Sequence, residues 1–288
     1  MIHRKITVVV PCFNGERFLS QALTSVLAQT VQACEVIVGD DGSTDGSIAI
    51  GRSFGPAVHV VCHPDGGNHG LPATRNLVLR EARGDFIAFL DADDMWLPDH
   101  IKHLVEALES DPQLAFVVDN GIQFIDGGHE VGDQARDHRP GPIYAEELLL
   151  DQWFAPSGVI VRRAIFDEVD LFDTSMRYCE DQDLWLRILE RHPAAYVGGF
   201  GYRYRLHGAQ LSSSPKVWDG AERTLEKAIK RYPYPASVIR KRRAVIAFRR
   251  AQHAFTIGKK LSGLAKLAKA ALLDPHRAVK EIVRKCRS

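Results

Sequence analysis

The most constraining feature of this chain is a regular alternation of strand and helix signals over its first hundred residues. Short β-branched or apolar runs at 6–10, 36–38, 58–61 and 86–90 are separated by stretches whose apolar residues recur at helical spacing. Helices between consecutive strands imply right-handed crossovers, which set the strands parallel to one another. The alternation therefore predicts an α/β fold, in which a mainly parallel sheet lies between two layers of helices.

The fourth predicted strand ends abruptly in three acids. Asp91, Asp93 and Asp94 follow a run, Phe-Ile-Ala-Phe-Leu, that is apolar enough to be buried on both faces. Open α/β sheets bind ligands at the carboxyl ends of their strands, and carboxylates gathered there repel one another unless a cation offsets their charge. Oxygen ligands favour a hard ion such as Mg²⁺ or Mn²⁺, which completes its shell with water and substrate phosphates. The pattern predicts a metal site and a phosphorylated substrate.

Composition indicates a globular protein with an uneven distribution of charge. The 288 residues are 45% hydrophobic and 25% charged, which allows a sizeable core. Residues 1–214 hold 17 Lys and Arg against 31 Asp and Glu, whereas residues 215–288 hold 20 against 5. Scattered cysteines without a C-x-x-C pair favour a reducing compartment. No signal-peptide core or membrane-spanning run is present in the sequence, so we expect a cytoplasmic protein.

Beyond residue 97 the alternation loosens. Strand signals lie at 115–118, 122–125 and 158–161, and 195–206 reads as a pair of strands around two glycines. The stretch 126–142 is rich in Gly, Asp and His and lacks periodicity, which is typical of a functional loop. A Ser-Ser-Ser-Pro sequence ends the main domain, and the remaining residues, 213–288, are expected to form a basic helical appendage docked on it.

Polar segments follow each of the four first strands. They read Pro11-Cys-Phe-Asn-Gly-Glu16, Asp40-Asp41-Gly-Ser-Thr-Asp45, Asn68-His-Gly-Leu-Pro-Ala-Thr-Arg-Asn76 and Asp91-Ala-Asp-Asp94. Because the carboxyl ends of parallel strands share one edge of a sheet, we expect these segments to meet. We assign the turn and helix cap to Asp45 or Ser43, which leaves Asp40 free to accept a hydrogen bond from a base or ribose. Arg75 either reaches a diphosphate or forms a surface ion pair.

Together these motifs resemble those of family 2 glycosyltransferases with the GT-A fold. Two further segments share the resemblance, Cys-Glu-Asp-Gln-Asp-Leu-Trp-Leu-Arg at 179–187 and Tyr-Arg-Leu-His at 204–207, and the match spans roughly residues 5–212 in the family's order. The resemblance implies a GT-A domain over 1–212, with a nucleotide-sugar half at about 1–97 and an acceptor half at about 98–212. The C-terminal α-helical appendage lies outside it.

The resemblance also implies an activity. It is the metal-dependent, inverting transfer of a sugar, of hexosyltransferase type, from a nucleotide-diphosphate sugar to a hydroxyl on a glycan or lipid-linked acceptor. A UDP-sugar is favoured, with Mn²⁺ or Mg²⁺ as cofactor and cell-envelope or surface polysaccharide as the product. The residues that the resemblance places on the nucleotide-sugar are Pro11, Glu16, Asp40, Asp41, Arg75 and Asp91. It places the metal at Asp93 and His207 and makes Asp181 the catalytic base.

The chemistry of the reaction agrees with these roles. A hydroxyl is a poor nucleophile near neutral pH, so a carboxylate must take its proton as attack proceeds. Burial and the neighbouring acids Glu180 and Asp183 would raise the pKa of Asp181, although both neighbours equally suit the N-terminal end of a helix. One base without a second nucleophile implies a single displacement with inversion. For His207, a structural hydrogen bond is an even alternative to a metal.

Two other functions remain open from the sequence, a nucleotidyltransferase that acts on sugar phosphates and a non-catalytic nucleotide-sugar-binding module. The basic C-terminal region has its own alternatives. Few aromatic residues interleave its cations, so we expect no nucleic acid. The region contacts an anionic membrane peripherally at its inner face, forms a plain solvated face, or pairs with the acidic main domain.

Overall fold

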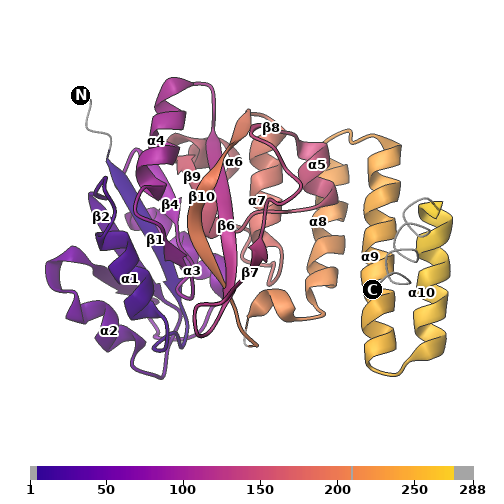
Figure 1. Cartoon of the computed structure of the whole chain (residues 1–288), viewed down its shortest axis with the longest axis horizontal. Helices are drawn as coiled ribbons and strands as arrows, with labels where there is room; N and C mark the ends of the chain where they lie inside the picture. The colour runs from indigo at the N-terminus through magenta and orange to yellow at the C-terminus, as the bar shows by residue number, and fades with distance from the viewer. Residues whose placement is uncertain (1–4, 209, 276–288) are drawn as a thin grey trace.

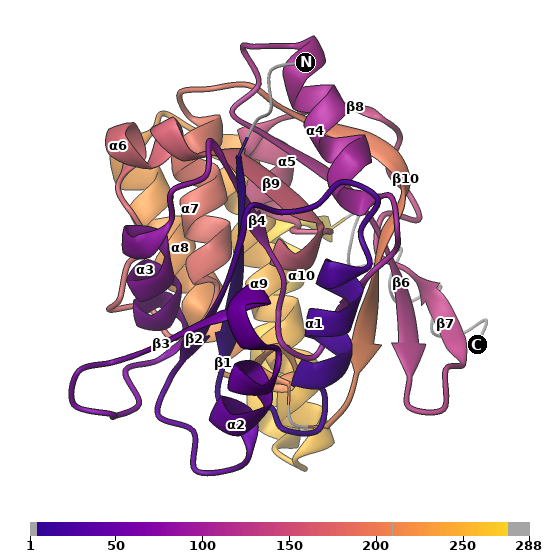
Figure 2. The same cartoon turned by 90° about the vertical axis from the view of Figure 1, so that its left-hand side faces the viewer.

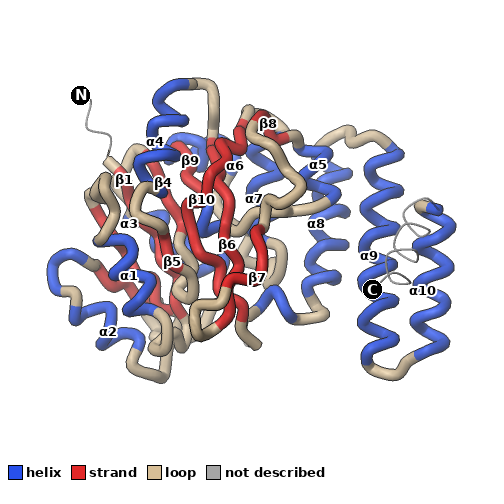
Figure 3. Tube along the Cα trace, viewed as in Figure 1, coloured by secondary structure: helices blue, strands red, loops and turns tan. Residues whose placement is uncertain are grey.

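A central sheet with helices on both faces organises the molecule in the computed structural model, which describes residues 5–208 and 210–275. Within these residues the sheet has ten strands, in the order β3-β2-β1-β4-β9-β6-β10-β5, with β7 beside β6 and β8 beside β10. Figure 3 shows the strands between layers of helices. The first four strands are β1 (Ile6–Cys12), β2 (Glu35–Asp40), β3 (His59–Cys62) and β4 (Phe86–Phe89), and they are parallel. This half of the sheet agrees with the predicted alternation.

The second half of the sheet is mixed. β9 (Val159–Arg162) runs antiparallel to both β4 and β6 (Phe116–Ile125), while β10 (Ala194–Leu206) is parallel to β6. The short strand β5 (Met95–Trp96) pairs antiparallel with β10 and brings the segment after Asp94 back across the sheet edge. Residues before and after position 98 thus share one continuous sheet.

Alternating side chains give the sheet two apolar faces. Val8 and Val10 of β1 point to α1 (Leu19–Leu27) and α4 (His100–Ser110), whereas Val9 points to α3 (Leu71–Glu81) and α7 (Glu180–Leu189). Figure 2 shows α1 and α3 on opposite sides of β1 and β2. Trp185 of α7 is fully buried in the second of these cores. The predicted three-layered α/β fold is therefore confirmed. The expectation of a mainly parallel sheet holds only for the first four strands, because β9 runs antiparallel to both of its neighbours.

The C-terminal region is helical, as predicted. Helix α8 (Val217–Arg231) buries Leu225 and Ala228 in the same core as α7, and α9 (Ala236–Thr256) and α10 (Lys260–Leu273) form a hairpin at the end of the molecule remote from α2 (Ser47–Ser53) (Figure 1). At Gly263 the two helices come so close that a Cβ would lie 2.7 Å from the Phe255 ring, so a larger residue would require that ring to move. Among the described helices, none is both long and apolar enough to cross a membrane.

Three expectations for the second half were wrong, and two of them concern strands that run on through polar or glycine residues. β6 is one strand rather than two, because Asp119 lies 2.6 Å from His100 Nδ1 and Asn120 accepts a bond from the Ala135 amide at 2.8 Å. β10 is likewise one strand. Gly198 and Gly199 have φ of 77° and 72°, and the register against β6 shifts there, which makes a bulge and not a turn.

The third wrong expectation concerns the stretch 126–142, which was predicted to be a loop. It contains β7 (Glu130–Asp133) and β8 (Gly141–Ile143), and both pair antiparallel with a longer strand. The side chains of β7 are largely exposed, so the sequence carries no apolar alternation that would reveal an edge strand. Two short helices, α5 (Ala145–Leu150) and α6 (Phe166–Val169), lie between the later strands.

Candidate active site at the carboxyl edge of the sheet

The loops that follow β1, β2 and β4 contact one another at the carboxyl edge. The amide of Asn14 donates to Ser43 Oγ at 2.9 Å, and that of Glu16 donates to Asp45 Oδ2 at 3.0 Å. A Cβ on Gly15 would lie 3.7 Å from that of Ala92, so the first loop also touches the acidic segment after β4. These three predicted segments thus meet directly, and the fourth, residues 68–76, joins them through the bonds that the amides of His69 and Gly70 donate to Asp41, as the parallel order of the strands requires.

At this edge, Pro11 lies in β1 opposite Gly39, and Glu16 lies in the loop that follows. The Glu16 carboxylate accepts a 2.7 Å bond from the Gly46 amide, so it ties its loop to the start of α2. Asp45 accepts a 3.0 Å bond from the Ser47 amide, which is the capping role expected of it.

Asp40 and Asp41 are both buried and serve different loops. Asp40 Oδ2 accepts bonds from the amides of Gly42 and Ser43, each at 3.0 Å, so the expectation that Asp40 takes no part in the turn is wrong. Its other oxygen, Oδ1, is buried and has no hydrogen-bond partner among the described residues. The Asp41 carboxylate accepts from the amides of His69 and Gly70 at 2.7 and 3.0 Å. Asp41 therefore positions the loop after β3, and Asp40 keeps one acceptor unused.

Arg75 is a buried bridge between two distant acids. Its Nη2 donates to Asp91 and its Nη1 to Glu180, both at 2.8 Å, and its side chain is 1% exposed. Burial opposes the charge of Arg75, but Asp91, Glu180 and Asp181 outweigh it and raise the pKa of the guanidinium. The sequence alternatives were a diphosphate contact or a surface ion pair, whereas the structure shows a buried ion pair that joins β4 to α7.

The three acids after β4 point in different directions. Asp91 pairs with Arg75, whereas Asp94 turns inward, is 1% exposed, and accepts bonds from Ser157 Oγ at 2.6 Å and the Arg205 amide at 2.9 Å. Burial, and then the charges of Asp93 and Asp91, raise the pKa of Asp94 well above its usual value. Asp94 is thus part of the framework, and Asp91 and Asp93 are the acids that face the edge.

Asp93 and His207 form a pair that suits a divalent cation. His207 Nε2 lies 2.8 Å from Asp93 Oδ2, and burial together with the charge of Asp91 raises the pKa of Asp93. Neighbouring ligands of an octahedral ion with bonds of about 2.1 Å are roughly 3 Å apart, so these two atoms can share one ion. No three His, Cys, Asp or Glu side chains of the described part of the chain are grouped to hold a metal. Substrate phosphate and water would have to complete the shell.

Asp181 lies in the first turn of α7, next to the Arg75 bridge. Its Oδ2 accepts a 2.6 Å bond from Gln152 Nε2, and the preceding Cys179 has a left-handed backbone, with φ of 58°. Burial, and then the charge of Asp181, raise the pKa of Glu180 to about 7 against the opposing charge of Arg75. Asp183 is fully buried on the other side, 2.8 Å from Lys227 of α8. Of the three acids in this turn, Glu180 and Asp183 pair with cationic side chains, whereas Asp181 accepts a bond from the neutral Gln152.

Comparison with known proteins identifies the family. The model of glycosyl transferase family 2 matches residues 7–170. The chain belongs to this family. Over 242 residues it is 26% identical to an uncharacterized glycosyltransferase of Rickettsia typhi, an alignment that covers 77% of this chain and 73% of that protein. The enzyme is thus a family 2 glycosyltransferase.

Solved structures confirm the GT-A fold. TarS of S. aureus, in complex with UDP-GlcNAc, superposes with a TM-score of 0.70 at 18% identity, over 95% of this chain and 82% of that one. The mannosyltransferase PcManGT of Pyrobaculum calidifontis, in complex with GDP-Man and Mn²⁺, gives a TM-score of 0.66 at 18% identity, over 99% of this chain and 80% of that one. At this identity the likeness establishes the fold.

Three residues that hold the candidate site together were not predicted from the sequence. Arg205 donates from Nε to the Asp93 carbonyl at 2.8 Å and from Nη2 to Gln21 at 2.7 Å, with its guanidinium 4.5 Å from the centre of the Phe18 ring. Ser157 holds Asp94, and Gln152 holds Asp181. A charged residue within the motif at 204–207 was a signal for Arg205. No local pattern marks Gln152 or Ser157.

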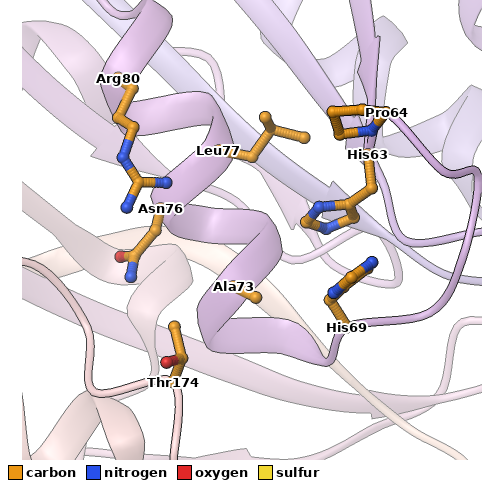
Figure 4. A pocket seen from close by; sticks show the side chains of 8 residues that line it. All are labelled: His63, Pro64, His69, Ala73, Asn76, Leu77, Arg80 and Thr174. Carbon is orange, nitrogen blue, oxygen red and sulfur yellow. The ribbon is translucent and has the colours of Figure 1, made fainter.

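A surface hollow of about 580 Å³ lies along α3, apart from these residues. It is lined by His63, Pro64, His69, Ala73, Asn76, Leu77, Arg80 and Thr174. Figure 4 shows the two imidazoles on one side of the helix and Arg80 on the other, and the imidazole centres are 4.3 Å apart. None of the predicted site residues lines this hollow, although the amide of His69 is bonded to Asp41.

Proposed function

We propose that the enzyme transfers a sugar from a nucleotide-diphosphate sugar, with UDP-sugars favoured, to a hydroxyl of a glycan or lipid-linked acceptor, with inversion, in polysaccharide biosynthesis. The observation that carries the proposal is the Arg75 bridge, whose 2.8 Å bonds to Asp91 and Glu180 join the acidic edge of the sheet to the start of α7. The Arg75 guanidinium therefore lies between Asp91, which would face the donor, and the first turn of α7, where Asp181 would deprotonate the acceptor. A nucleotidyltransferase has no need of the second group.

On the donor side, Pro11, Glu16, Asp40 and Asp41 surround the nucleoside in this proposal. The unused Asp40 Oδ1 supports it, because a buried carboxylate oxygen without a partner suits a donor from a base or ribose. Arg75 is 1% exposed and bonded to Asp91 and Glu180, so a contact with the ribose-diphosphate side requires the Asp91 bond to open or the donor to reach a remaining N–H. The nucleotide-sugar half at about 1–97 and the acceptor half at about 98–212 of the proposed 1–212 domain meet at this residue.

Asp93 and His207 would hold Mn²⁺ or Mg²⁺ in this proposal, together with the donor's phosphates. The 2.8 Å separation of their donor atoms and the presence of Mn²⁺ in the mannosyltransferase of the same fold support this. An ion there stabilises the negative charge that builds on the leaving diphosphate. Arg205 keeps the segment in place through its bond to the Asp93 carbonyl.

Asp181 is the proposed base. As the acceptor oxygen attacks the anomeric carbon, Asp181 takes the hydroxyl proton and the bond to the diphosphate oxygen breaks, so a single displacement inverts the centre. The Asp181 carboxylate is oriented through both oxygens, because Oδ2 accepts a 2.6 Å bond from Gln152 and Oδ1 accepts a 2.8 Å bond from the Gln182 amide. Each carboxylate oxygen keeps a second lone pair, which can take the proton. Glu180 is held by Arg75 and is 5% exposed, which makes it unsuited to act as a second nucleophile.

Screening the full chain against UDP- and GDP-sugars with Mn²⁺ tests the proposal, with thermal shift for donor binding and release of nucleoside diphosphate for turnover. Asp181→Asn should keep the donor shift and lower turnover by about 10²–10⁴-fold, since it removes only the base. Asp167→Asn makes the same change on an exposed residue of α6 and should behave as wild type.

Two results would contradict the proposal. Release of pyrophosphate in place of nucleoside diphosphate would indicate a nucleotidyltransferase. A donor shift without turnover in every acceptor mixture, unchanged by Asp181→Asn, would indicate a binding module.

A further inference from the structure

Helix α10 has an apolar face that no described part of the chain covers. At ~100° between successive helical residues, positions 261, 264, 265, 268 and 272 share one side of the helix. All five are exposed, and the leucines among them are the most apolar, with Leu261 at 85%, Leu264 at 56% and Leu272 at 82% exposed. The opposite side of the helix buries Gly263 and Ala270. The outer face of α10 is thus the reverse of what a solvent-facing helix normally presents.

Lysines border this apolar face. Lys260 lies at one edge and Lys269 at the other, both exposed, and Lys259 stands just before the helix. Ile257, at the tip of the hairpin, is a further exposed apolar residue, at 49%. A row of leucines between two edges of lysine is the pattern of a helix that lies in a membrane interface.

The cations of α10 differ from those of α8, which serve the fold. Lys227 and Arg231 of α8 bind Asp183 at 2.8 and 3.5 Å, so the pairing of the basic region with the acidic domain is confirmed for that helix. α10 is the outermost element of the hairpin, at the end of the molecule opposite α1 (Figure 1). The basic residues of 276–288 lie outside the described residues.

We propose that the outer face of α10 docks on an anionic lipid bilayer, with the three leucines inserted among the acyl chains and the bordering lysines at the headgroups. The region 215–288 carries 20 Lys and Arg against 5 Asp and Glu, which complements such a surface. A second copy of the chain is a poorer occupant, because pairing two such faces would bring like charges together. This inference does not depend on the proposed reaction.

Co-sedimentation of the full chain with vesicles tests the docking surface. At low salt the wild type should sediment with vesicles of phosphatidylcholine and phosphatidylglycerol and much less with phosphatidylcholine alone. The triple variant Leu261→Gln, Leu264→Gln, Leu272→Gln should partition at least about tenfold less, because the apolar side chains that insert among the acyl chains are replaced by polar ones. Lys260→Glu with Lys269→Glu should weaken binding at low salt and make little difference at high salt.

Matched controls separate docking from misfolding. The three leucines are exposed, so the triple variant should keep the wild-type melting temperature. Val131→Gln removes an apolar side chain that is 53% exposed on β7 and should sediment as wild type. The proposal is overturned if the wild type does not bind anionic vesicles or if the triple variant binds them as well as the wild type. It is also overturned if sedimentation equilibrium shows a wild-type dimer that is monomeric in the triple variant. No donor or acceptor is needed, so such failures leave the proposed transfer reaction standing.

Discussion

Acids cluster on two sides of α7, and the two clusters differ in their supply of cations. The edge cluster consists of Asp91, Asp93, Glu180 and Asp181, with Arg75 and His207. The α8 cluster consists of Asp173, Asp183 and Glu190, with Arg187, Lys227 and Arg231. In the α8 cluster each acid pairs with at least one Lys or Arg side chain. In the edge cluster four acids share one such side chain, Arg75. Balanced acids build structure, and a deficit of cations leaves a site that attracts one.

The pKa directions follow this difference. In the α8 cluster, burial works against the ionised form of Asp173, but the hydrogen bonds from Lys227 and Ser175 outweigh it and lower its pKa. In the edge cluster, burial and neighbouring acids raise the pKa of Asp93, and they raise that of Glu180 to about 7. The same residue types are therefore driven in opposite directions by their neighbours.

Arg75→Met should have the largest effect. It removes the only permanent cation of the edge cluster among the described residues and leaves Asp91 and Glu180 facing each other without compensation. We expect the free energy of unfolding, measured in urea, to fall by about 3–5 kcal/mol. Adding Glu180→Gln to Arg75→Met should restore part of the loss. A variant as stable as wild type would show that the bridge does not hold the two halves together.

Mn²⁺ with UDP should stabilise the protein through the edge cluster. A ligand at a hundred times its dissociation constant stabilises by about 2.7 kcal/mol, which a thermal melt detects readily. Asp93→Asn should abolish the part of the shift that requires Mn²⁺, while Asp173→Asn, in the α8 cluster, should preserve it. If Asp93→Asn and Asp173→Asn showed equal Mn²⁺-dependent shifts in melting temperature, the ion would not bind at Asp93.

Lys227→Met should cost less than Arg75→Met, about 1–2 kcal/mol in urea denaturation. Asp183 would still have Arg187 at 3.1 Å and Arg231 at 3.5 Å, which offset its loss. Asp173 would lose the bond from Lys227, but its side chain is 30% exposed, so water can solvate the carboxylate. Lys230→Met, on the same helix, serves as the matched control and should lie within about 0.5 kcal/mol of wild type. If Lys227→Met and Arg75→Met cost the same, the contrast in cation supply does not govern stability.

The pH dependence of Asp173 should give the smallest effect. Because its folded pKa is depressed, the stability that Asp173 contributes is complete above its unfolded pKa and is lost as the pH falls below about 4. The urea midpoints of wild type and Asp173→Asn should therefore differ at neutral pH and converge in acid. A difference as large at pH 3 as at neutral pH would mean that the carboxylate acts through something other than its charge.

The predictability of the site varies residue by residue. Asp91 and Asp93 could be located from the sequence because an apolar run ends directly before them, and Asp45 could be assigned as a cap from its local spacing. The turn made by Asp40 was missed, because one carboxylate can serve a turn and still keep an unused oxygen. The continuity of β6 and β10 was missed because polar residues and glycines usually indicate the end of a strand. In β6 the polar Asp119 is paired with His100 of α4, and in β10 the glycines form a bulge against β6.

The sequence by itself determined the order of strands and helices in the first half, the gathering of acids at one edge and the split between an acidic domain and a basic region. These follow from periodicity and composition, which act over a few residues. Tertiary structure alone decided that Asp94 turns inward to Ser157 and Arg205, that Arg75 bridges Asp91 and Glu180, and that the leucines of α10 face outward. Each of these features depends on residues that are distant in the sequence. Their burial determines which carboxylates have a partner within the protein and which do not.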